Sequence, residues 1–273
     1  MIVFPTAKIN IGLYVTEKRS DGFHNIETLF YPVPFYDALE FVEHNNQSAP
    51  DSLIVTGIDV GNHEDNLVIK AVKKLRERKN FPMLKIHLHK AIPTKAGLGG
   101  GSSDAAFILK GINQLYGLEM NSEELKAMAL EIGSDCPFFI DAVPAYASGR
   151  GEILQPLKTE ILNNHYIVLA KAEKGINTKI AYMNCCPTVP PISLNSVIEN
   201  VPVSQWKGLI KNDFDEYAFG EEPLIAKLID EMYIAGAVFS LMSGSGSAVY
   251  GIFKNRPQLS ELLKKRTIWQ GFI

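Results

Sequence analysis

The stretch Pro93–Ser103, with sequence PTKAGLGGGSS, places four glycines within positions 97–101 and follows them with two serines. Glycine adopts backbone torsions that other residues resist, and its missing Cβ lets an anion approach the main chain. The N–H groups of such a loop can converge on phosphate oxygens, and the positive end of a following helix adds to the attraction. The stretch therefore predicts a phosphate-binding loop, and the alternative is a flexible or tight connection between two elements.

A strand and a helix are predicted on either side of this loop. Residues 84–90 (LKIHLHK) alternate apolar and polar side chains, as a half-buried strand does, and a helix is expected from Asp104 to about Tyr116. The loop lacks the Gly-Lys-Ser/Thr ending of a Walker A motif, and Ser102 stands where a GxGxxG dinucleotide motif has its last glycine. We therefore expect a phosphate site of neither kind, in which the hydroxyls of Ser102 and Ser103 bind phosphate or Mg²⁺.

Further outward, several strands precede the first helix, which indicates an α+β fold rather than a regular βαβ series. The other predicted strands lie at residues 2–4, 9–15, 26–34, 37–43, 52–57, 166–170, 239–242 and 248–253. The other predicted helices begin near residue 66 and span residues 122–132 and 223–233. A change in the residue pattern along the chain predicts two domains, 1–155 and 156–273.

Composition and charge exclude several classes of protein. The chain has 273 residues, 46% hydrophobic and 21% charged, as a globular protein does. A formal charge of −3 supplies no basic field for nucleic acid, so no nucleic-acid partner is expected. Neither a signal peptide nor an apolar run of about 20 residues is present, and only three cysteines occur, so we expect a cytoplasmic protein without a membrane partner.

Two short motifs near the N-terminus bear on binding. Lys8 and Asn10 are two residues apart in a predicted strand and so share one face, opposite the hydrophobic one. The alternative for this pair is a solvent-facing strand edge. In the turn at residues 21–24 (DGFH), the ring of Phe23 and the imidazole of His24 can stack on and hydrogen-bond a base. The alternative for this turn is a surface loop with a hydrophobic anchor.

Two motifs in the second half of the chain are also candidates. Asp135 follows a predicted helix and precedes the apolar residues 136–139 (CPFF), and a carboxylate beside apolar residues is costly unless it is paired or functional. An exposed capping aspartate is the alternative. The Gly/Ser loop at residues 243–247 (SGSGS) is either a second backbone cradle or an ordinary hairpin turn.

Together these segments resemble the GHMP kinase superfamily, whose hallmark loop, Pro-x-x-x-Gly-Leu-Gly-x-Gly-Ser-Ser, is matched by Pro93–Ser103. The branch of the superfamily is indicated by four further segments, which lie at residues 7–13 (AKINIGL), 19–24 (RSDGFH), 133–139 (GSDCPFF) and 242–247 (MSGSGS). The matches run from residue 7 to about residue 253. They therefore cover nearly the whole chain.

The resemblance implies a two-domain GHMP kinase fold, with an N-terminal domain like ribosomal protein S5 domain 2, a ferredoxin-like C-terminal domain and an active site between them. It implies a small-molecule kinase that uses ATP and Mg²⁺. The branch acts on the 2-hydroxyl of a cytidine diphosphate-linked methylerythritol in the non-mevalonate route to isoprenoid precursors. The expected oligomeric state is a monomer or a weak homodimer.

The resemblance also implies residue roles. Asp135 stands at the position of the catalytic base, and Lys8 stands at the position of the lysine that pairs with it. The ATP-binding positions are Pro93, Gly97, Leu98, Gly99, Gly100, Gly101, Ser102 and Ser103, with Asn66, Leu67 and Lys90 near the adenine. The acceptor-binding positions are Asn10, Phe23, His24, Thr178 and Tyr182. No carboxylate for the metal is identified, so its ligands are unknown beyond phosphate, water and the candidate Ser103.

Two residues depart from the family pattern. Phe23 stands where the family usually has tyrosine, so its ring keeps the ability to stack but loses a hydroxyl. Lys95 stands where the family loop often carries glycine. A GHMP kinase of mevalonate, homoserine or a sugar is the nearest alternative, and a non-catalytic nucleotide-binding domain is another. A base-binding pair disfavours the first, and the presence of both Lys8 and Asp135 disfavours the second.

Overall fold

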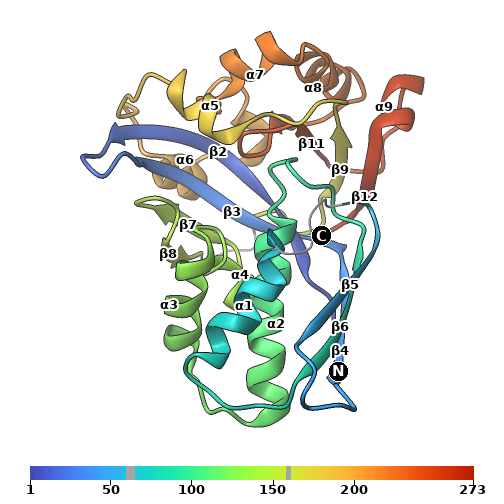
Figure 1. Ribbon diagram of the computed structural model, residues 1–273. Coiled ribbons are helices and arrows are strands. Elements are labelled where there is room, and N and C mark those ends of the chain that lie inside the picture. Colours follow the sequence, from blue (N-terminus) through green and yellow to red (C-terminus); the bar gives the residue numbers. More distant parts are fainter. Residues whose placement is uncertain (60–64, 158–160) are drawn as a thin grey trace. The chain divides into compact units, whose positions relative to one another are not determined.

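The computed structural model describes residues 1–59, 65–157 and 161–273, and they fall into two compact units (Figure 1). Unit 1 consists of Met1–Ala7, Phe35–Thr94 and Gly99–Val143, and unit 2 consists of Lys8–Pro34, Lys95–Leu98 and Pro144–Ile273. The units are therefore interleaved along the chain, and the phosphate loop contributes to both. The domain boundary after residue 155 stays a prediction.

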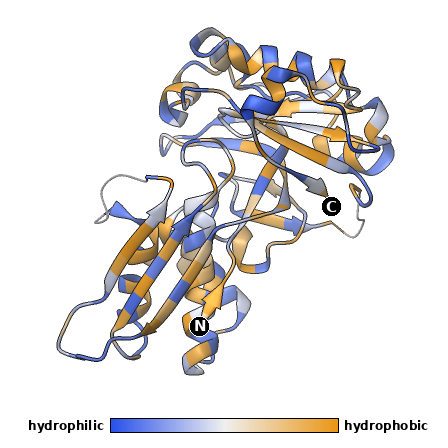
Figure 2. Cartoon of the chain, turned by 90° about the vertical axis from the view of Figure 1, so that its right-hand side faces the viewer, coloured by the Kyte–Doolittle hydropathy of each residue, from blue (hydrophilic) through white to orange (hydrophobic). Residues whose placement is uncertain are grey.

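The sheet of unit 1 has the order β1 (Ile2–Val3), β4 (Ala38–Glu43), β6 (Leu84–Lys90), β5 (Ser52–Gly57). Strand β6 pairs antiparallel with β4 and parallel with β5. Alternate residues of β6 are buried, which confirms the predicted strand, and Figure 2 shows the matching alternation of hydropathy in this sheet. The last buried position of the strand is Lys90, directly before the loop.

Four helices of the described part of unit 1 accompany this sheet: α1 (Leu67–Arg76), α2 (Gly100–Tyr116), α3 (Ser122–Ile132) and α4 (Phe138–Asp141). Figure 1 shows α1 and α2 on one side of the strands. A Cβ on Gly111 of α2 would lie 2.6 Å from Cζ of Phe41 in β4, so the helix packs closely on the sheet. Asn66 caps α1, and Asn121 with Glu124 forms a capping box at α3.

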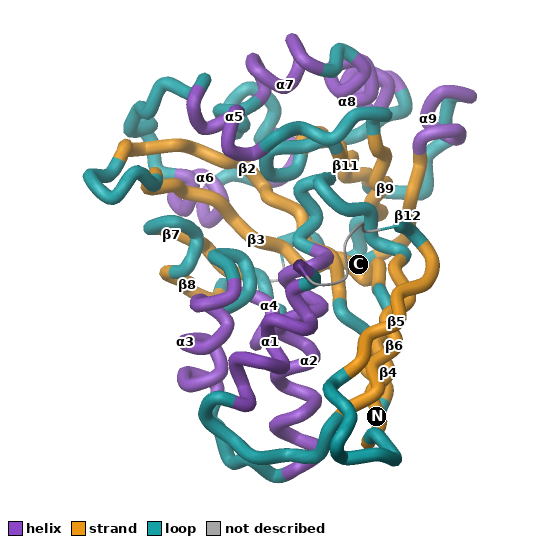
Figure 3. The backbone as a smooth tube through the Cα atoms, in the orientation of Figure 1, coloured by secondary structure: helices purple, strands orange, loops and turns teal. Residues whose placement is uncertain are grey.

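Most strands of unit 2 belong to two sheets. One has the order β2 (Thr6–Lys18), β3 (His24–Tyr36), β7 (Ala145–Ser148), β8 (Ile153–Pro156), and the other has the order β10 (Phe239–Met242), β11 (Ala248–Phe253), β9 (Tyr166–Lys171), β12 (Thr267–Phe272). The helices described in this unit are α5 (Thr178–Met183), α6 (Leu194–Asn200), α7 (Asp215–Glu221), α8 (Leu224–Ile234) and α9 (Glu261–Arg266), with a 3₁₀ turn at Val203–Gln205. Leu228 and Met232 of α8 share a core with Val249 and Phe253 of β11, and Figure 3 shows these elements together.

Each strand and helix predicted above has a counterpart, and the α+β class is confirmed. Helix α2 begins at Gly100 rather than at the expected Asp104, because Gly99 adopts a left-handed φ of 70° and the helix starts directly after it. The sequence patterns did not predict the short strands β7 and β8, the C-terminal β12, or α4, α5, α6, α7 and α9. Within residues 1–59, 65–157 and 161–273, no helix combines the length and apolar character needed to cross a bilayer.

Candidate active site

The start of α2 in unit 1 offers backbone N–H groups at the end of the glycine-rich loop. The first intrahelical bond runs from the N–H of Ser103 to the carbonyl oxygen of Gly99, at 2.9 Å, so the N–H groups of Gly100, Gly101 and Ser102 precede it. A Cβ built on Gly101 would meet only Leu67, 3.7 Å away, so the space outside Gly101 is open. This geometry suits an anion at the positive end of the helix.

A buried ion group lies beneath this helix start. The ammonium of Lys90 donates to Asp37 and to Oδ2 of Asp104, the latter at 2.7 Å, and Lys90 is only 2% exposed. The other oxygen of Asp37, Oδ1, accepts the N–H groups of Ala91 and Ile92 at 2.7 and 2.9 Å. Sequence reasoning singled out Lys90 but missed both carboxylates, because neither belongs to a chemistry-bearing motif.

The environment of Asp104 raises the pKa of its carboxyl group above the usual value. Burial raises the pKa of this carboxyl to about 7, the charge of Lys90 opposes the rise, and the nearby Asp37 adds to it. Its Oδ1 atom is buried and has no hydrogen-bond partner among the described residues. Asp37 and Asp104 therefore share one ammonium, that of Lys90.

Asp135 lies in the turn between α3 and α4, next to the fully buried Cys136. Burial raises the pKa of the Cys136 thiol to about 12, a hydrogen bond with the side chain of Ser102 opposes this, and the charge of Asp135 adds to it. The thiol thus stays neutral at physiological pH and forms a side-chain bond between the Asp135 turn and the first turn of α2.

In unit 2 the middle of the glycine-rich loop packs against the Gly/Ser loop between β10 and β11. Gly97 has a left-handed φ of 77°, and a Cβ there would lie 1.8 Å from the carbonyl oxygen of Ser243. The hydroxyl of Ser243 donates to the carbonyl oxygen of Gly97 at 2.8 Å, and the N–H of Ala248 donates to the carbonyl oxygen of Ala96 at 3.0 Å. The second loop is a hairpin connection, and it also supports the first.

One residue of the glycine-rich loop has an unusual backbone conformation, and a buried side chain anchors the hairpin loop. Lys95 adopts a φ of 51°, which explains why glycine suits its position in the family pattern. The side-chain amide of Asn212, 3% exposed, donates to the carbonyl oxygens of Met242 and Gly244 at 3.1 and 2.7 Å. The hairpin loop is therefore anchored by a buried side chain that sequence reasoning missed.

Lys8 and Asn10 lie within a buried hydrogen-bond network in β2, not on a solvent-facing edge. The ammonium of Lys8 donates to Oδ1 of Asn10 and lies 4.8 Å from the centre of the Phe30 ring. The amide of Asn10 donates to Oγ1 of Thr28 at 2.9 Å, and Thr28 donates to the carbonyl oxygen of Gly12 at 2.6 Å. Lys8 and Asn10 lie on the face of β2 opposite Ile9, and all three residues are buried. This part of the strand is therefore buried on both faces.

This network is continuous with the glycine-rich loop. The backbone N–H of Lys8 donates to the carbonyl oxygen of Leu98 at 3.0 Å, and the N–H of Asn10 donates to Oγ of Ser243 at 3.1 Å. Strand β2 therefore carries the two predicted polar residues along the edge of both loops. The structure brings together Lys8, Asn10, Gly97 and Leu98 within unit 2.

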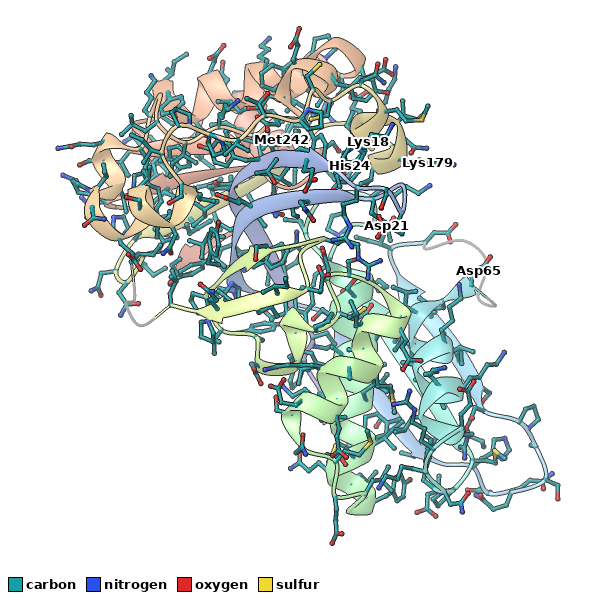
Figure 4. All side chains as sticks on the ribbon, turned by 90° about the vertical axis from the view of Figure 1, so that its left-hand side faces the viewer. Lys18, Asp21, His24, Asp65, Lys179 and Met242 are labelled. Carbon is teal, nitrogen blue, oxygen red and sulfur yellow. The ribbon has the colours of Figure 1, made fainter. Side chains whose placement is uncertain are left out.

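The predicted base-binding residues lie at the end of the β2–β3 hairpin. Phe23 is 51% exposed, and the guanidinium of Arg150 lies 4.7 Å from the centre of its ring. His24, labelled with Asp21 in Figure 4, stacks on Tyr182 with ring centroids 5.0 Å apart and an interplanar angle of 16°. Burial, and then the charge of Lys18, lower the pKa of His24, so its imidazole is neutral at physiological pH.

Thr178 and Tyr182 are four residues apart in α5 and therefore lie on one face of that helix. The hydroxyl of Thr178 shares a hydrogen bond of 2.7 Å with the hydroxyl of Ser245 in the hairpin loop. Tyr182 also meets Phe214 edge to face at 4.8 Å. The two predicted acceptor-binding residues of α5 thus lie on one face of the helix, and Thr178 attaches this face to the Gly/Ser loop.

The remaining predicted residues lie in unit 1. Asn66 accepts the N–H of Val68 at 2.9 Å as the cap of α1, Leu67 neighbours Gly101, and Pro93 follows the strand end held by Asp37. Asp135 belongs to unit 1 and Lys8 to unit 2. Their pairing stays a prediction, as do the individual binding roles.

A metal ion would find few protein ligands here. In the part of the chain that the structure describes, no group of three or more His, Cys, Asp or Glu side chains has the arrangement of a metal site. Oγ of Ser103 is fully buried and has no partner among these residues. Such a set fits Mg²⁺ that is held mainly by nucleotide phosphates and water, with at most one protein oxygen.

Comparison with known proteins agrees with this arrangement. Residues 66–149 match the family described as GHMP kinases N terminal domain, and residues 194–267 match GHMP kinases C terminal. The 4-diphosphocytidyl-2-C-methyl-D-erythritol kinase of Parabacteroides distasonis is 45% identical over 99% of both chains. The enzyme of the same name from Porphyromonas gingivalis is 45% identical over 96% of this chain and 95% of its own.

Solved structures add the fold. A crystal structure of 4-(cytidine 5'-diphospho)-2C-methyl-D-erythritol kinase has a TM-score of 0.78 and 30% identity, and covers 99% of this chain and 98% of its own. Methanococcus jannaschii mevalonate kinase shares the fold, with a TM-score of 0.61 at 15% identity over 97% of this chain and 92% of its own. The chain therefore belongs to the GHMP kinases and, within them, to the family of 4-diphosphocytidyl-2-C-methyl-D-erythritol kinases.

Proposed function

We propose that this chain transfers the γ-phosphate of ATP to the 2-hydroxyl of 4-diphosphocytidyl-2-C-methyl-D-erythritol, a step toward isoprenoid precursors that does not use mevalonate. The observation that carries the proposal is the buried network of β2. Its backbone bonds to the phosphate loop at Leu98, and its side chains place an ammonium, from Lys8, beside an amide, from Asn10. The 45% sequence identity to two kinases of that name, over nearly the full length of the chain, supports the same function.

The glycine-rich loop is proposed to bind the ATP phosphates. The N–H groups of Gly100, Gly101 and Ser102 precede the first bond of α2, and the space outside Gly101 is open. Pro93, Gly97, Leu98, Gly99 and Ser103 complete the loop, and Asn66, Leu67 and Lys90 are the residues that the family resemblance assigns to the adenine end. Mg²⁺, held by the phosphates, water and Ser103, would neutralise charge on the phosphates.

In the proposed reaction the acceptor 2-oxygen forms a bond to the γ-phosphorus as the bond from that phosphorus to the β–γ bridging oxygen breaks, and ADP leaves. Asp135 takes the hydroxyl proton, and the ammonium of Lys8 offsets the negative charge that develops on the oxygens. Phosphoryl transfer needs chiefly positioning and charge neutralisation, so few reactive side chains suffice.

Acceptor recognition is proposed to rest on the hairpin of β2 and β3 and on α5. Phe23 offers an exposed ring face, and the neutral imidazole of His24 both donates and accepts hydrogen bonds, as a cytosine edge requires. Asn10, Thr178 and Tyr182 are the further candidates. Mevalonate and homoserine have no base, so this aromatic group would have no partner in a kinase for either.

An acceptor panel tests the proposal. We expect ADP release and a new phosphate monoester when the protein is supplied with ATP and 4-diphosphocytidyl-2-C-methyl-D-erythritol, and neither with mevalonate or homoserine. Phosphorus NMR of the product identifies the phosphorylated position. Turnover of mevalonate, or a folded protein that turns over none of the three acceptors, would refute the proposal. A cytoplasmic location and a monomeric or weakly dimeric state remain predictions.

A further inference from the structure

Asp37, Lys90 and Asp104 tie together the two chain segments that flank the glycine-rich loop. These three residues, which we call the loop clamp, all belong to unit 1 and are 1%, 2% and 2% exposed. Asp37 lies directly before β4, Lys90 ends β6, and Asp104 is the fifth residue of α2. Buried charges are costly unless they are paired and hydrogen-bonded. Three ionisable side chains buried together next to the glycine-rich loop therefore indicate a role other than core packing.

The first side of the loop clamp holds the chain where it leaves the sheet. Oδ1 of Asp37 accepts the N–H groups of Ala91 and Ile92 at 2.7 and 2.9 Å, and these residues directly precede Pro93. The N–H of Asp37 itself donates to the carbonyl oxygen of Pro5 at 2.9 Å. The carboxylate is therefore fixed by its own backbone and in turn fixes the direction in which the loop departs.

The second side of the loop clamp holds the start of α2. The ammonium of Lys90 bonds to Asp37 and, at 2.7 Å, to Asp104 one turn into the helix. A Cβ on Gly100 would lie 3.1 Å from this ammonium and 2.9 Å from Cγ2 of Ile92, so the first residue of the helix packs directly on the clamp. The position of the N–H groups that face the loop thus depends on Lys90.

We propose that the loop clamp is a positioning device for nucleotide binding, in which Asp37 and Asp104, through Lys90, set the spacing between the strand end and the helix start. Lys90 then acts from below the loop, a role different from the adenine contact that the family resemblance implies. The inference rests on the proposed function only in taking ATP as the ligand of the loop. Hydrogen-bonded ion pairs are directional, so they hold this spacing more narrowly than apolar packing would.

The decisive variant is Asp37→Asn, which keeps the shape of the side chain. Asp37 uses one oxygen for two backbone N–H groups and the other for the ammonium of Lys90. An amide has a single oxygen, so its NH₂ group must face either those N–H donors or the ammonium. Asp104→Asn is milder, since its oxygen can still accept from Lys90 and only the charge is lost. Lys90→Met removes the ammonium and leaves both carboxylates unpaired.

Asp51 provides a matched control in the same unit. Its carboxylate forms two bonds of 2.7 Å with the guanidinium of Arg76 and accepts the N–H of Leu84, also at 2.7 Å. Leu84 begins β6, whereas Lys90 ends it, so Asp51 holds the opposite end of the same strand. In Asp51→Asn, the new NH₂ group must likewise face a donor, either the guanidinium of Arg76 or the N–H of Leu84. Because this site lies away from the loop, the variant measures how weakening the sheet alone affects stability and binding.

The experiment is calorimetric titration of the wild-type and variant proteins with a non-hydrolysable ATP analogue, with thermal melting of each. We expect Asp37→Asn and Lys90→Met to raise the Kd by about 10- to 100-fold, the loss typical of a loop displaced by a fraction of an ångström or more. Asp104→Asn should raise it roughly three- to ten-fold. Asp51→Asn should lower the melting temperature but leave the Kd within about two-fold of wild type.

Three outcomes would overturn the loop clamp. These are a wild-type Kd in folded Asp37→Asn, a wild-type Kd in folded Asp104→Asn, and a loss of affinity in Asp51→Asn as large as that in Asp37→Asn at similar melting temperature. If Asp37→Asn does not fold, the comparison of Asp104→Asn with Asp51→Asn decides in the same way. A wild-type protein that binds no analogue contradicts the proposed function instead, so the two failures are distinguishable.

Discussion

Substituting alanine for Gly97 should separate the two Gly-rich loops of unit 2. The new Cβ would lie 1.8 Å from the carbonyl oxygen of Ser243 and 2.7 Å from its carbonyl carbon, far inside contact distance. Ser243 cannot easily retreat, because the hairpin loop on either side of it is held by Asn212, through the carbonyl oxygens of Met242 and Gly244. The loops must therefore move apart by about 1 Å or more before the methyl group fits.

The cost follows from the bonds that this separation breaks. An alanine at a φ of 77° costs about 1–2 kcal/mol in backbone strain. Two hydrogen bonds also stretch, one from the hydroxyl of Ser243 to Gly97 at 2.8 Å and one from Ala248 to Ala96 at 3.0 Å, and each contributes about 0.5–1.5 kcal/mol. Together these terms predict a destabilisation of about 2–5 kcal/mol, or a melting temperature lower by about 5–15 °C.

Two measurements check this prediction. Thermal melting gives the loss of stability, and titration with a non-hydrolysable ATP analogue gives the loss of binding, which we expect to reach about 100-fold because the phosphate loop is displaced. Gly208→Ala is the control. Gly208 lies in the same unit with a φ of 82°, but no atom lies within 4 Å of its would-be Cβ, so this variant carries the backbone strain without the clash.

The comparison between the two glycines can refute the reasoning. If Gly97→Ala and Gly208→Ala have the same free energy of unfolding, and Gly97→Ala binds the analogue as wild type does, then the contact between the loops does not constrain the site. A loss of binding in Gly208→Ala equal to that in Gly97→Ala would point to global destabilisation instead of a local displacement.

Three further predictions concern other parts of the molecule. Asp135→Asn should keep the affinity for the ATP analogue and lower kcat by about 10²- to 10⁴-fold, because the proposed base is lost. Tyr182→Ala should raise the KM of the acceptor by about 5- to 100-fold and leave the KM of ATP unchanged, since an aromatic ring contributes about 1–3 kcal/mol to stacking on a base. Burial, and then the charge of Asp213, raise the pKa of Asp215 in α7 to about 7, from 3.8. The folded state therefore binds this proton more tightly than the unfolded state, and stability from Asp215 is complete below about pH 4 and is lost as the pH rises to about 7. Asp215→Asn should remove up to about 4 kcal/mol of this pH dependence, measured by denaturant unfolding between pH 4 and 8.

Each of these predictions has a contradicting result. Wild-type kcat in Asp135→Asn removes this residue from the proton transfer. An equal rise of both KM values in Tyr182→Ala indicates a general disturbance rather than a base-binding role. Parallel stability curves for wild type and Asp215→Asn across the pH range would show that the folded state does not raise the pKa of this carboxyl.

Regular patterns in the sequence predicted the elements that surround the site. The alternation of residues 84–90 predicted β6 with its correct bounds, because one face of that strand packs on helices and the other does not. The predicted strand at residues 9–15 was also confirmed, but the face that carries Lys8 and Asn10 is not open to solvent. Thr6 through Val15 are all buried, because polar partners such as Thr28 satisfy the side chains on the second face.

The loop clamp and the hairpin support could not be predicted, for a physical reason. Asp37, Asp104 and Asn212 act through partners that are 14 to 55 positions away in the chain. A single carboxylate or amide carries no periodicity, and its role is defined only when the fold encloses it. Arg150 is a similar case, since its contact with Phe23 joins the turn between β7 and β8 to the hairpin of β2 and β3. The start of α2 escaped prediction because glycines there weaken the helical pattern, whereas its end at Tyr116 was predicted correctly.

The interleaving of the two units has a consequence for how the protein is made. Unit 1 has all its residues once Val143 has been synthesised, whereas Lys8–Pro34 must wait for Pro144–Ile273 before unit 2 is complete. At roughly 5–20 residues per second, the early hairpin of β2 and β3 spends several seconds on the ribosome without the strand β7 that pairs with β3. During that interval the apolar residues of β2, which end up fully enclosed, face solvent or a chaperone. A chain that ends at Val143 should therefore contain a complete unit 1 and a hairpin of β2 and β3 that lacks β7.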